Sequence, residues 1–219
     1  MRKDIITAAI GIVVLTLFLG ILYPLVVTGI SQVAFPGNAN GQQVKVDGKV
    51  VGSQLIGQNF STQAYKNGKP VMKNGEPVTN PDPRYFQTRP SATVPSDNAA
   101  ATTFSNLGPN NTATEQEISS NVQAYIALNA RYYPRKLTAA TVPVDAANSS
   151  ASGIDPDISV RNADIQAYRV AAVRHRPLAA VMTLVSKYTG GRGLGFSGEP
   201  SVNVLELNLA LDRMTGVHA

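Results

Sequence analysis

The strongest pattern in the chain is an unbroken apolar run near its start. No charged residue occurs from residue 5 to residue 30. A helix of that length reaches ~39 Å, which exceeds the ~30 Å hydrocarbon core of a bilayer. The run therefore predicts one membrane-spanning helix over about residues 5–30. One alternative is a buried helix of a soluble domain, which is rarely so long. The other is a cleavable signal peptide cut near Gly37-Asn38-Ala39, but the apolar part of such a peptide is usually only about 7–15 residues long.

Basic residues near the two ends of this run predict its direction. Arg2 and Lys3 precede it, and the next basic residue is Lys45. Because cytoplasmic flanks carry an excess of Lys and Arg, the N-terminus is expected in the cytoplasm. Residues 1–34 then form a cytoplasmic N-terminus with the single transmembrane helix, and residues 35–219 form an extracytoplasmic domain.

Small residues and threonines recur along one stripe of the predicted helix. At such positions another transmembrane helix can approach closely, since association in a membrane depends on packing. The other interpretation is that an apolar helix carries some Gly and Thr by chance. The candidate partner contacts are Thr7, Gly11, Thr16, Gly20, Pro24 and Thr28.

Beyond the helix, short alternating runs and turn dipeptides predict β-hairpins. Residues 44–51 hold two β-prone runs around Asp47-Gly48, which is typical of a type I′ turn. Residues 66–78 contain a near-duplication of Lys-Asn-Gly, and prolines follow as far as Pro83. We expect an exposed loop or small hairpin excursion here, at about 65–84.

Three helices are predicted in the outer domain. Thr112 with Glu115 has the capping-box spacing and opens a helix to about Ala130. Ser159 can cap a second helix, and Pro177, at a first-turn position, begins a third. The expected inward residues are Ile118, Val122, Tyr125, Ile126 and Asn129 in the first, Ile165, Tyr168, Ala172 and Val173 in the second, and Val181, Leu184, Val185 and Tyr188 in the third.

The last patterned segment, residues 202–211, alternates leucine with other residues. A period of two favours a half-buried strand, with a short helix as the alternative for so leucine-rich a run. Strands and helices are thus both expected outside the membrane. The predicted fold class is α+β: one N-terminal transmembrane helix followed by a mixed α/β domain.

Composition excludes several classes of site. The 219 residues include no Cys and two His, so disulfides, thiolate sites, histidine-based zinc centres and His-dependent triads are not expected. The net charge of +5 is spread thinly, without the basic stripe and interleaved aromatics of a nucleic-acid-binding protein.

Four local motifs have a functional and a plain structural interpretation, and the structural one is favoured for each. Residues 193–198 match GxGxxG but precede a β-like run, so we predict a Gly-rich turn rather than a dinucleotide site. Asp155-Pro156-Asp157 could hold a cation but is more typical of a turn before a capped helix. Residues 149–153 could hold an anion and are expected to be a flexible linker. His175 is expected at a solvated helix end and His218 in a frayed terminus.

Several strings of the outer domain resemble, in order, the C subunit of the bacterial Kdp potassium-transporting ATPase. The strings are GSQLIGQNF at 52–60, YFQTRPSA at 85–92, SNLGP at 105–109, VPVD at 142–145, SGIDPDIS at 152–159 and VNVLELNLALD at 202–212. Two departures are the expanded link holding the Lys-Asn-Gly duplication and the changed stretch at 147–153. The family-motif positions are Gln58, Phe60, Arg89, Pro90, Ser91, Ala92, Asn106, Leu107, Gly153, Asp155, Ile158, Ser159, Gln166, Arg169, Asn203 and Asn208.

The resemblance implies a non-catalytic accessory subunit of a high-affinity K⁺ uptake complex in the cell membrane. It implies a channel-like potassium-translocating subunit, a P-type ATPase subunit and a small single-span subunit as partners, and a place beside the outer entrance of the K⁺ path. The complex would use ATP, Mg²⁺ and K⁺, and this chain would hold no cofactor and bind no nucleic acid. ATP binding is a family-level suggestion that the predicted topology opposes, so any effect on nucleotide affinity would travel by conformational coupling. The alternatives are a membrane-anchored extracytoplasmic solute-binding or sensor domain and an anchored enzyme.

Overall fold

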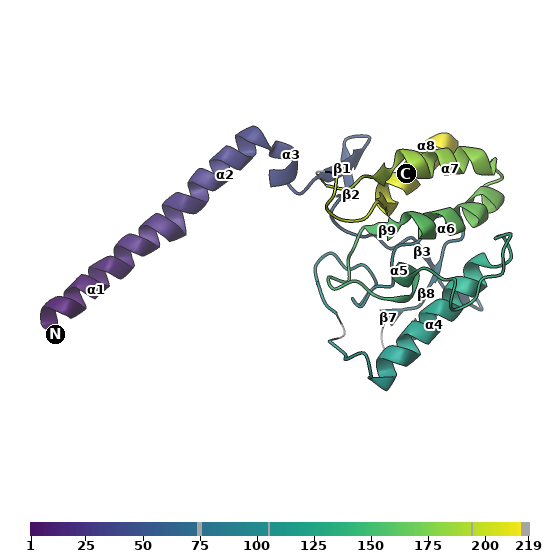
Figure 1. Ribbon diagram of the computed structural model, residues 1–219, viewed down its shortest axis with the longest axis horizontal. Helices are drawn as coiled ribbons and strands as arrows, with labels where there is room; N and C mark the ends of the chain where they lie inside the picture. Colours follow the sequence, from purple (N-terminus) through teal and green to yellow (C-terminus); the bar gives the residue numbers. More distant parts are fainter. Residues whose placement is uncertain (74–75, 105, 194, 216–219) are drawn as a thin grey trace.

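The computed structural model describes residues 1–73, 76–104, 106–193 and 195–215. Its N-terminal part is a single rod that projects from the rest of the molecule (Figure 1). The rod consists of α1 (Arg2–Leu15), a π-helical segment η1 (Thr16–Leu22) and α2 (Tyr23–Ala34), and the short helix α3 (Pro36–Ala39) follows. Its 33 residues form one continuous helix, long and apolar enough to cross a membrane.

The rod differs from the uniform helix expected from the sequence. It is longer than residues 5–30, and its middle seven residues have the wider π-helical geometry. Pro24, the second residue of α2, has no N–H to donate, which favours a changed hydrogen-bond pattern in the preceding turn. The apolar side chains of the rod are exposed along its length, and none is buried against the rest of the chain.

The first hairpin was predicted correctly. Strand β1 (Gln43–Val46) pairs antiparallel with β2 (Lys49–Ser53). The two residues between them, Asp47 and Gly48, have φ of 49° and 79°, as a type I′ turn requires.

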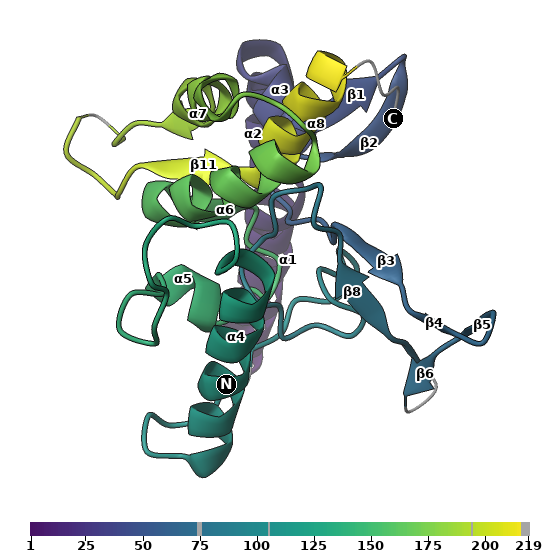
Figure 2. The same cartoon turned by 90° about the vertical axis from the view of Figure 1, so that its right-hand side faces the viewer.

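The predicted excursion is an arm of three small hairpins that reaches away from the body (Figure 2). Its base is the pair β3 (Ser61–Gln63) and β8 (Thr79–Pro81), and β4 (Tyr65–Lys66) pairs with β5 (Lys69–Pro70). Strands β6 (Met72–Lys73) and β7 (Glu76–Pro77) form the third hairpin. Asn67 and Gly68 both have positive φ, so the first Asn-Gly turn is confirmed. The second, at 74–75, lies outside the described residues.

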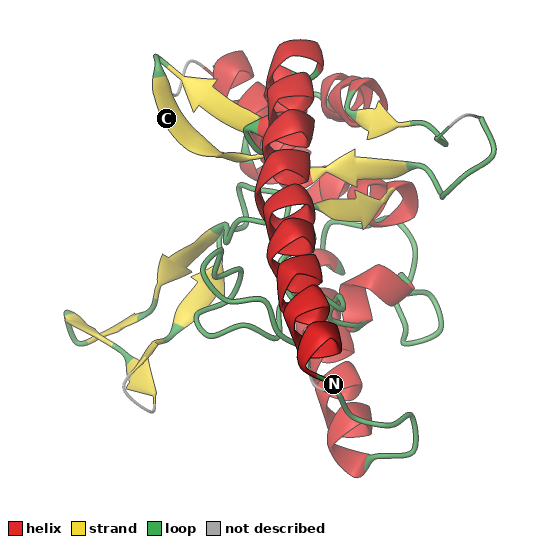
Figure 3. Ribbon diagram, turned by 90° about the vertical axis from the view of Figure 1, so that its left-hand side faces the viewer, coloured by secondary structure: helices red, strands yellow, loops and turns green. Residues whose placement is uncertain are grey.

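The body combines five helices of the described chain with a small antiparallel sheet (Figure 3). The sheet has the order β10-β11-β9, with β9 at Asp157–Ser159, β10 at Thr189–Gly190 and β11 at Ser201–Asn203. The core lies between this sheet and the last three helices, with Phe86 and Ile158 among its most buried apolar side chains. The helices are α4 (Thr112–Asn129), α5 (Val144–Ala147), α6 (Val160–Val173), α7 (Leu178–Lys187) and α8 (Val204–Thr215).

Three helix starts refine the predictions. Ser159 caps α6 as expected, since its side chain accepts the Asn162 N–H. At α4 the prediction was wrong by one residue: Asn111 is the cap and accepts the Ala113 N–H, so Thr112 is already helical. Pro177 is the residue before α7 rather than part of its first turn.

The buried face of α6 is wider than predicted and partly polar. Ile165 is buried, but Ala172 is exposed. The residues that replace it in the interior include Asn162, Gln166 and Arg169. A pattern search for apolar side chains could not find a face whose largest members are polar.

The predicted strand over 202–211 was wrong beyond its first two residues. Pairing ends at Asn203, whose side chain accepts the Glu206 N–H and so starts a helix. Alternating leucines suggested one buried face, but the segment forms a helix that is buried on several sides. Leucines that point in different directions around this helix are therefore all covered. Asn203 with Glu206 is itself a capping signal that favours the helix.

The remaining local predictions have mixed outcomes. Gly193 and Ser197 form a bridge within the turn between β10 and β11, as the Gly-rich interpretation predicted. His175 is exposed at the end of α6, also as expected, and His218 lies outside the described residues. The linker prediction for 149–153 was wrong, because Ser150 and Gly153 are buried.

Candidate functional site

Residues 82–97, a segment that begins and ends in turns and has no strand partner, cross the body. In its middle, at the buried Phe86 and the half-buried Gln87, the backbone polar groups need hydrogen bonds from elsewhere. Two amide side chains supply them. Asn208 of α8 accepts the Phe86 N–H and donates to the Phe86 carbonyl, both at 2.9 Å. Gln166 of α6 does the same for Gln87, at 2.8 and 3.0 Å. Each amide thus takes the place of a neighbouring strand.

Arg169 of α6 holds the start of this segment through hydrogen bonds to its backbone carbonyls. The residue is fully buried, and its Nη1 donates to the carbonyls of Pro83 and Tyr85 at 2.7 and 3.0 Å. Its Nε donates to Asn129 Oδ1, and its Nη2 donates to Gln166 Oε1. All four acceptors are neutral. Burial therefore lowers the pKa of Arg169 to about 10, which still leaves the guanidinium charged at neutral pH.

A second polar cluster lies at the same end of the segment. Arg174 pairs with Asp212 at 2.8 Å and stacks over the Tyr85 ring at 4.5 Å. Tyr85 donates to Asp212, and burial together with that carboxylate raises the pKa of Tyr85. Burial also acts to raise the pKa of Asp82, but hydrogen bonds and charge from Arg84 outweigh it and hold that pKa below its ordinary value.

The far end of the segment is held by the 149–157 region. Arg89 pairs with Asp155 at 3.0 Å, and Ser91 donates to the Gly153 carbonyl at 2.5 Å. Gly153 has φ +72°, and a Cβ there would lie 2.6 Å from the Thr103 carbonyl oxygen. Glycine is therefore required by both conformation and space. Asp155 is occupied by Arg89, so the cation interpretation of this motif is not supported.

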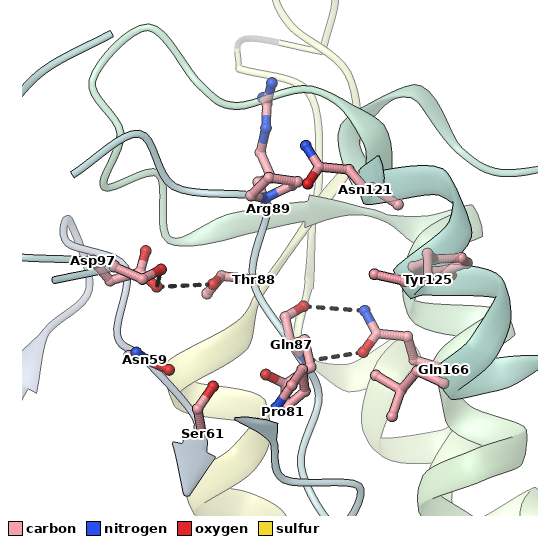
Figure 4. A pocket seen from close by; sticks show the side chains of 15 residues that line it. Asn59, Ser61, Pro81, Gln87, Thr88, Arg89, Asp97, Asn121, Tyr125 and Gln166 are labelled. Atoms are coloured by element: carbon pink, nitrogen blue, oxygen red, sulfur yellow. Dashed lines mark hydrogen bonds between the residues drawn. The ribbon is translucent and has the colours of Figure 1, made fainter. Parts of the chain in front are cut away.

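Beside the segment lies a cavity of about 200 Å³. Figure 4 shows Thr88 near its centre, with Asp97 on one side and Tyr125 and Gln166 on the other. Thr88 and Ser96 donate to Asp97 at 3.3 Å, but burial outweighs them and raises the pKa of Asp97 to about 6. The walls offer amides, hydroxyls, the Arg89 side chain and the Asp97 carboxyl group, whose charge changes in mildly acid solution. Such a cavity can hold a small polar molecule, and among the described residues there is no cluster of three metal-ligating side chains.

The structure brings most of the predicted positions into this one region. Pro90 lines the cavity, and the Phe60 ring contacts Tyr85 at 5.5 Å between centroids. Asn203 joins the first hairpin to β9 through the Gln54 carbonyl and Asp157. The other positions held near the segment or its supports are Gln58, Ala92, Ile158 and Ser159.

Two groups of predicted positions lie elsewhere. Asn106 and Leu107 are exposed on the loop before α4 and join no part of the network. The membrane candidates Thr7, Gly11, Thr16, Gly20, Pro24 and Thr28 all lie on the rod, away from the outer domain.

Sequence reasoning missed several residues that complete the network. Asp145 accepts hydrogen bonds from the backbone and hydroxyl of Ser159 and from Asn162. Asn129 was expected to be inward but not to receive Arg169, and nothing marked Asp97. The periodicity of α6 could have pointed to Asn162 if polar positions had been counted as inward.

Comparison with known proteins shows the family of this chain. The family model described as K⁺-transporting ATPase, c chain, matches residues 5–213. The chain belongs to the KdpC family. The KdpC subunit of the potassium-transporting ATPase of Methylococcus capsulatus is 45% identical over 208 residues, which cover 94% of this chain and 96% of the relative. The KdpC subunit of Streptomyces coelicolor is 44% identical, covering 92% and 88%, and that of Mycobacterium tuberculosis is 42% identical, covering 98% and 100%.

Proposed function

We propose that this chain is the non-catalytic accessory subunit of an ATP-driven potassium uptake complex. The observation that carries the proposal is its membership of the KdpC family over residues 5–213, with relatives named as subunits of a potassium-transporting ATPase. The form of the molecule supports it: one helix fits a single membrane crossing, and the polar side chains of the body are engaged in holding the body together.

The proposal extends to position and partners. The rod docks on a channel-like potassium-translocating subunit, and the outer domain, residues 35–219, caps the extracytoplasmic entrance of the K⁺ path. Arg2 and Lys3 hold the N-terminus in the cytoplasm. A P-type ATPase subunit and a small single-span subunit complete the assembly, which uses ATP, Mg²⁺ and K⁺ while this chain holds no cofactor.

Purification from native membranes tests the proposal. The full chain carries a tag at its C-terminus, and co-eluting proteins are identified by mass spectrometry. The expected result is stoichiometric recovery of a polytopic potassium-translocating subunit and a P-type ATPase subunit. Recovery of the chain alone would contradict the proposal.

A second candidate function is favoured by one observation, the polar cavity beside Thr88. A solute-binding or sensor domain would hold its ligand there. Ligand binding raises the unfolding temperature in proportion to the logarithm of its concentration. We therefore expect this candidate to be excluded if K⁺ and small polar metabolites leave the unfolding temperature of the full chain unchanged.

A further inference from the structure

The end of the π-helical segment, next to Pro24, leaves the backbone carbonyl of Leu19 without its usual donors. A helical carbonyl pairs with the amide four residues later in α-helical geometry and five residues later in π-helical geometry. For Leu19 these amides belong to Tyr23 and Pro24. Tyr23 donates instead to the Phe18 carbonyl, and Pro24 has no N–H. The Leu19 carbonyl therefore has neither helical donor.

The side chains of the rod itself do not replace them. Within a helix, a Ser or Thr three or four residues later can donate its hydroxyl back to a carbonyl. The residues at those positions after Leu19 are Leu22 and Tyr23, and neither carries a hydroxyl on Cβ. The donor has to come from outside the helix.

The surface next to this carbonyl is open to another helix. Gly20 follows Leu19, and a Cβ built on Gly20 would meet only Thr16 Cγ2, at 3.8 Å. Every residue of η1 is exposed, and so are Tyr23 and Pro24 in the turn that the carbonyl faces. A side chain from a neighbouring helix can therefore reach it.

Leaving this carbonyl unpaired in hydrocarbon is strongly unfavourable, because lipid offers no donor. We propose that the Leu19 carbonyl accepts a hydrogen bond from a Ser, Thr, Asn or Gln side chain on a transmembrane helix of the partner subunit. This inference rests on the proposed function. The chain itself argues against a second copy as the partner, since residues 17–23 at the same depth contain none of these four residue types.

A double-mutant cycle in the assembled complex tests the inference. Photo-leucine at position 19 of the full chain first identifies the facing residue by cross-linking and mass spectrometry. That donor is then replaced by an apolar isostere, such as Ala for Ser or Val for Thr, with Pro24 present or with Pro24→Ala. Alanine restores an N–H that can pair within the helix. When Pro24 is present, removing the partner's donor should weaken assembly ~3- to ~15-fold. When Pro24 is replaced by alanine, the same change should weaken assembly less than about 2-fold. Pro36→Ala, outside the membrane-spanning part, is the matched control and should not change the cycle.

Infrared spectroscopy of the Leu19 carbonyl tests the inference without any variant, and therefore also if a variant fails to assemble. A ¹³C=¹⁸O label at Leu19 should absorb at lower frequency in the complex than in the isolated chain in lipid. An unchanged band, equal losses in both arms of the cycle, or cross-links only to lipid or to a second copy would each overturn the inference. Cross-linking to a partner helix with no donor would do so while leaving the proposed function intact. Failure to recover any partner subunit contradicts the proposed function instead.

Discussion

The rod exposes apolar side chains, whereas the body buries polar ones. The rod is a 33-residue helix that is apolar beyond its first turn and exposed along its length, and no described part of the chain covers it. The body buries large polar side chains, including Arg169, Gln166 and Asn208, and gives each of them hydrogen bonds. The rod therefore depends on surroundings outside the chain, whereas the body is completed by contacts between segments far apart in sequence.

This difference predicts where substitutions act. Changes in the buried polar network should lower the stability of the body and leave assembly contacts of the rod in place. Changes on the rod should weaken assembly with partner subunits and leave the stability of the body unchanged.

The largest effect is expected for Arg169→Met. Methionine fills similar space but leaves the carbonyl of Pro83 and the side chain of Asn129 without this donor. The carbonyl of Tyr85 keeps only the Gln87 side chain as a donor. We expect a loss of about 3–5 kcal/mol in the free energy of unfolding, measured by urea denaturation of the full chain in detergent. Arg135→Met, at an exposed position, is the control and should change it by less than about 0.5 kcal/mol. Equal stability of the two variants would show that the network does not hold the segment.

A pair of glycines separates backbone conformation from crowding. Gly153 and Gly195 both have positive φ, but only Gly153 faces atoms that a Cβ would overlap. Gly195→Ala should cost about 1–2 kcal/mol, the ordinary penalty of the left-handed conformation. Gly153→Ala should cost at least about 1 kcal/mol more, since the backbone at Thr103 has to move. Similar losses in thermal unfolding would mean that the 149–153 region does not pack against the segment.

On the rod, Gly20→Leu should weaken assembly without destabilising the body. A leucine there fills the open surface beside Thr16 and keeps a partner helix at a distance. We expect recovery of partner subunits in co-purification to fall several-fold, with an unchanged unfolding transition of the body. Gly29→Leu, also open but off the small-residue stripe, is the matched control. If it reduces recovery as much as Gly20→Leu, the stripe is not the contact.

Asp97 predicts a pH dependence confined to the body. Its pKa is raised from 3.8 to about 6 in the folded chain. Between these values the folded state binds a proton that the unfolded state has released, so stability falls as pH rises from about 4 to about 6. We expect this part of the change to be about 1–2 kcal/mol after solvent screening, and Asp97→Asn to remove it. Urea denaturation between pH 4.5 and 7.5 avoids the range where Asp82, whose pKa is lowered, loses its contribution. Parallel profiles for the two proteins would refute the assignment.

The smallest effect concerns the start of α4. Asn111 accepts the Ala113 N–H, so Asn111→Ala should lower stability by about 1 kcal/mol. Thr112→Ala should change it by no more than a few tenths, because Thr112 is already helical. If Thr112→Ala lowered the unfolding temperature more than Asn111→Ala, the cap would be Thr112, as the sequence predicted.

The sequence was informative where structure is determined locally. The apolar rod, the turn at Asp47-Gly48 and the cap at Ser159 were all predicted from neighbouring residues. Long-range contacts decided the rest. The leucines of 202–211 alternate as a strand would, yet they lie on a helix because the sheet ends at Asn203.

The candidate site shows the same limit. Motif strings identified Gln166, Arg169 and Asn208, but not that all three serve the backbone of residues 82–97. Asp97 carried no signal, because its raised pKa arises from burial among segments that meet only in the folded chain. The π-helical segment was also missed, although Pro24 could have indicated a disturbed turn before it.

The most direct test of the account is the environment of the rod in the assembled complex. The chain has no Cys, so single cysteines can be placed at each position from 5 to 30 and spin-labelled without background. Oxygen, which concentrates in lipid, then reports by electron paramagnetic resonance which positions face the bilayer. We predict that all positions are accessible in the isolated chain and that one continuous stripe through residues 16 and 20 becomes protected in the complex. Uniform accessibility in the complex would contradict the claim that a partner subunit covers the rod.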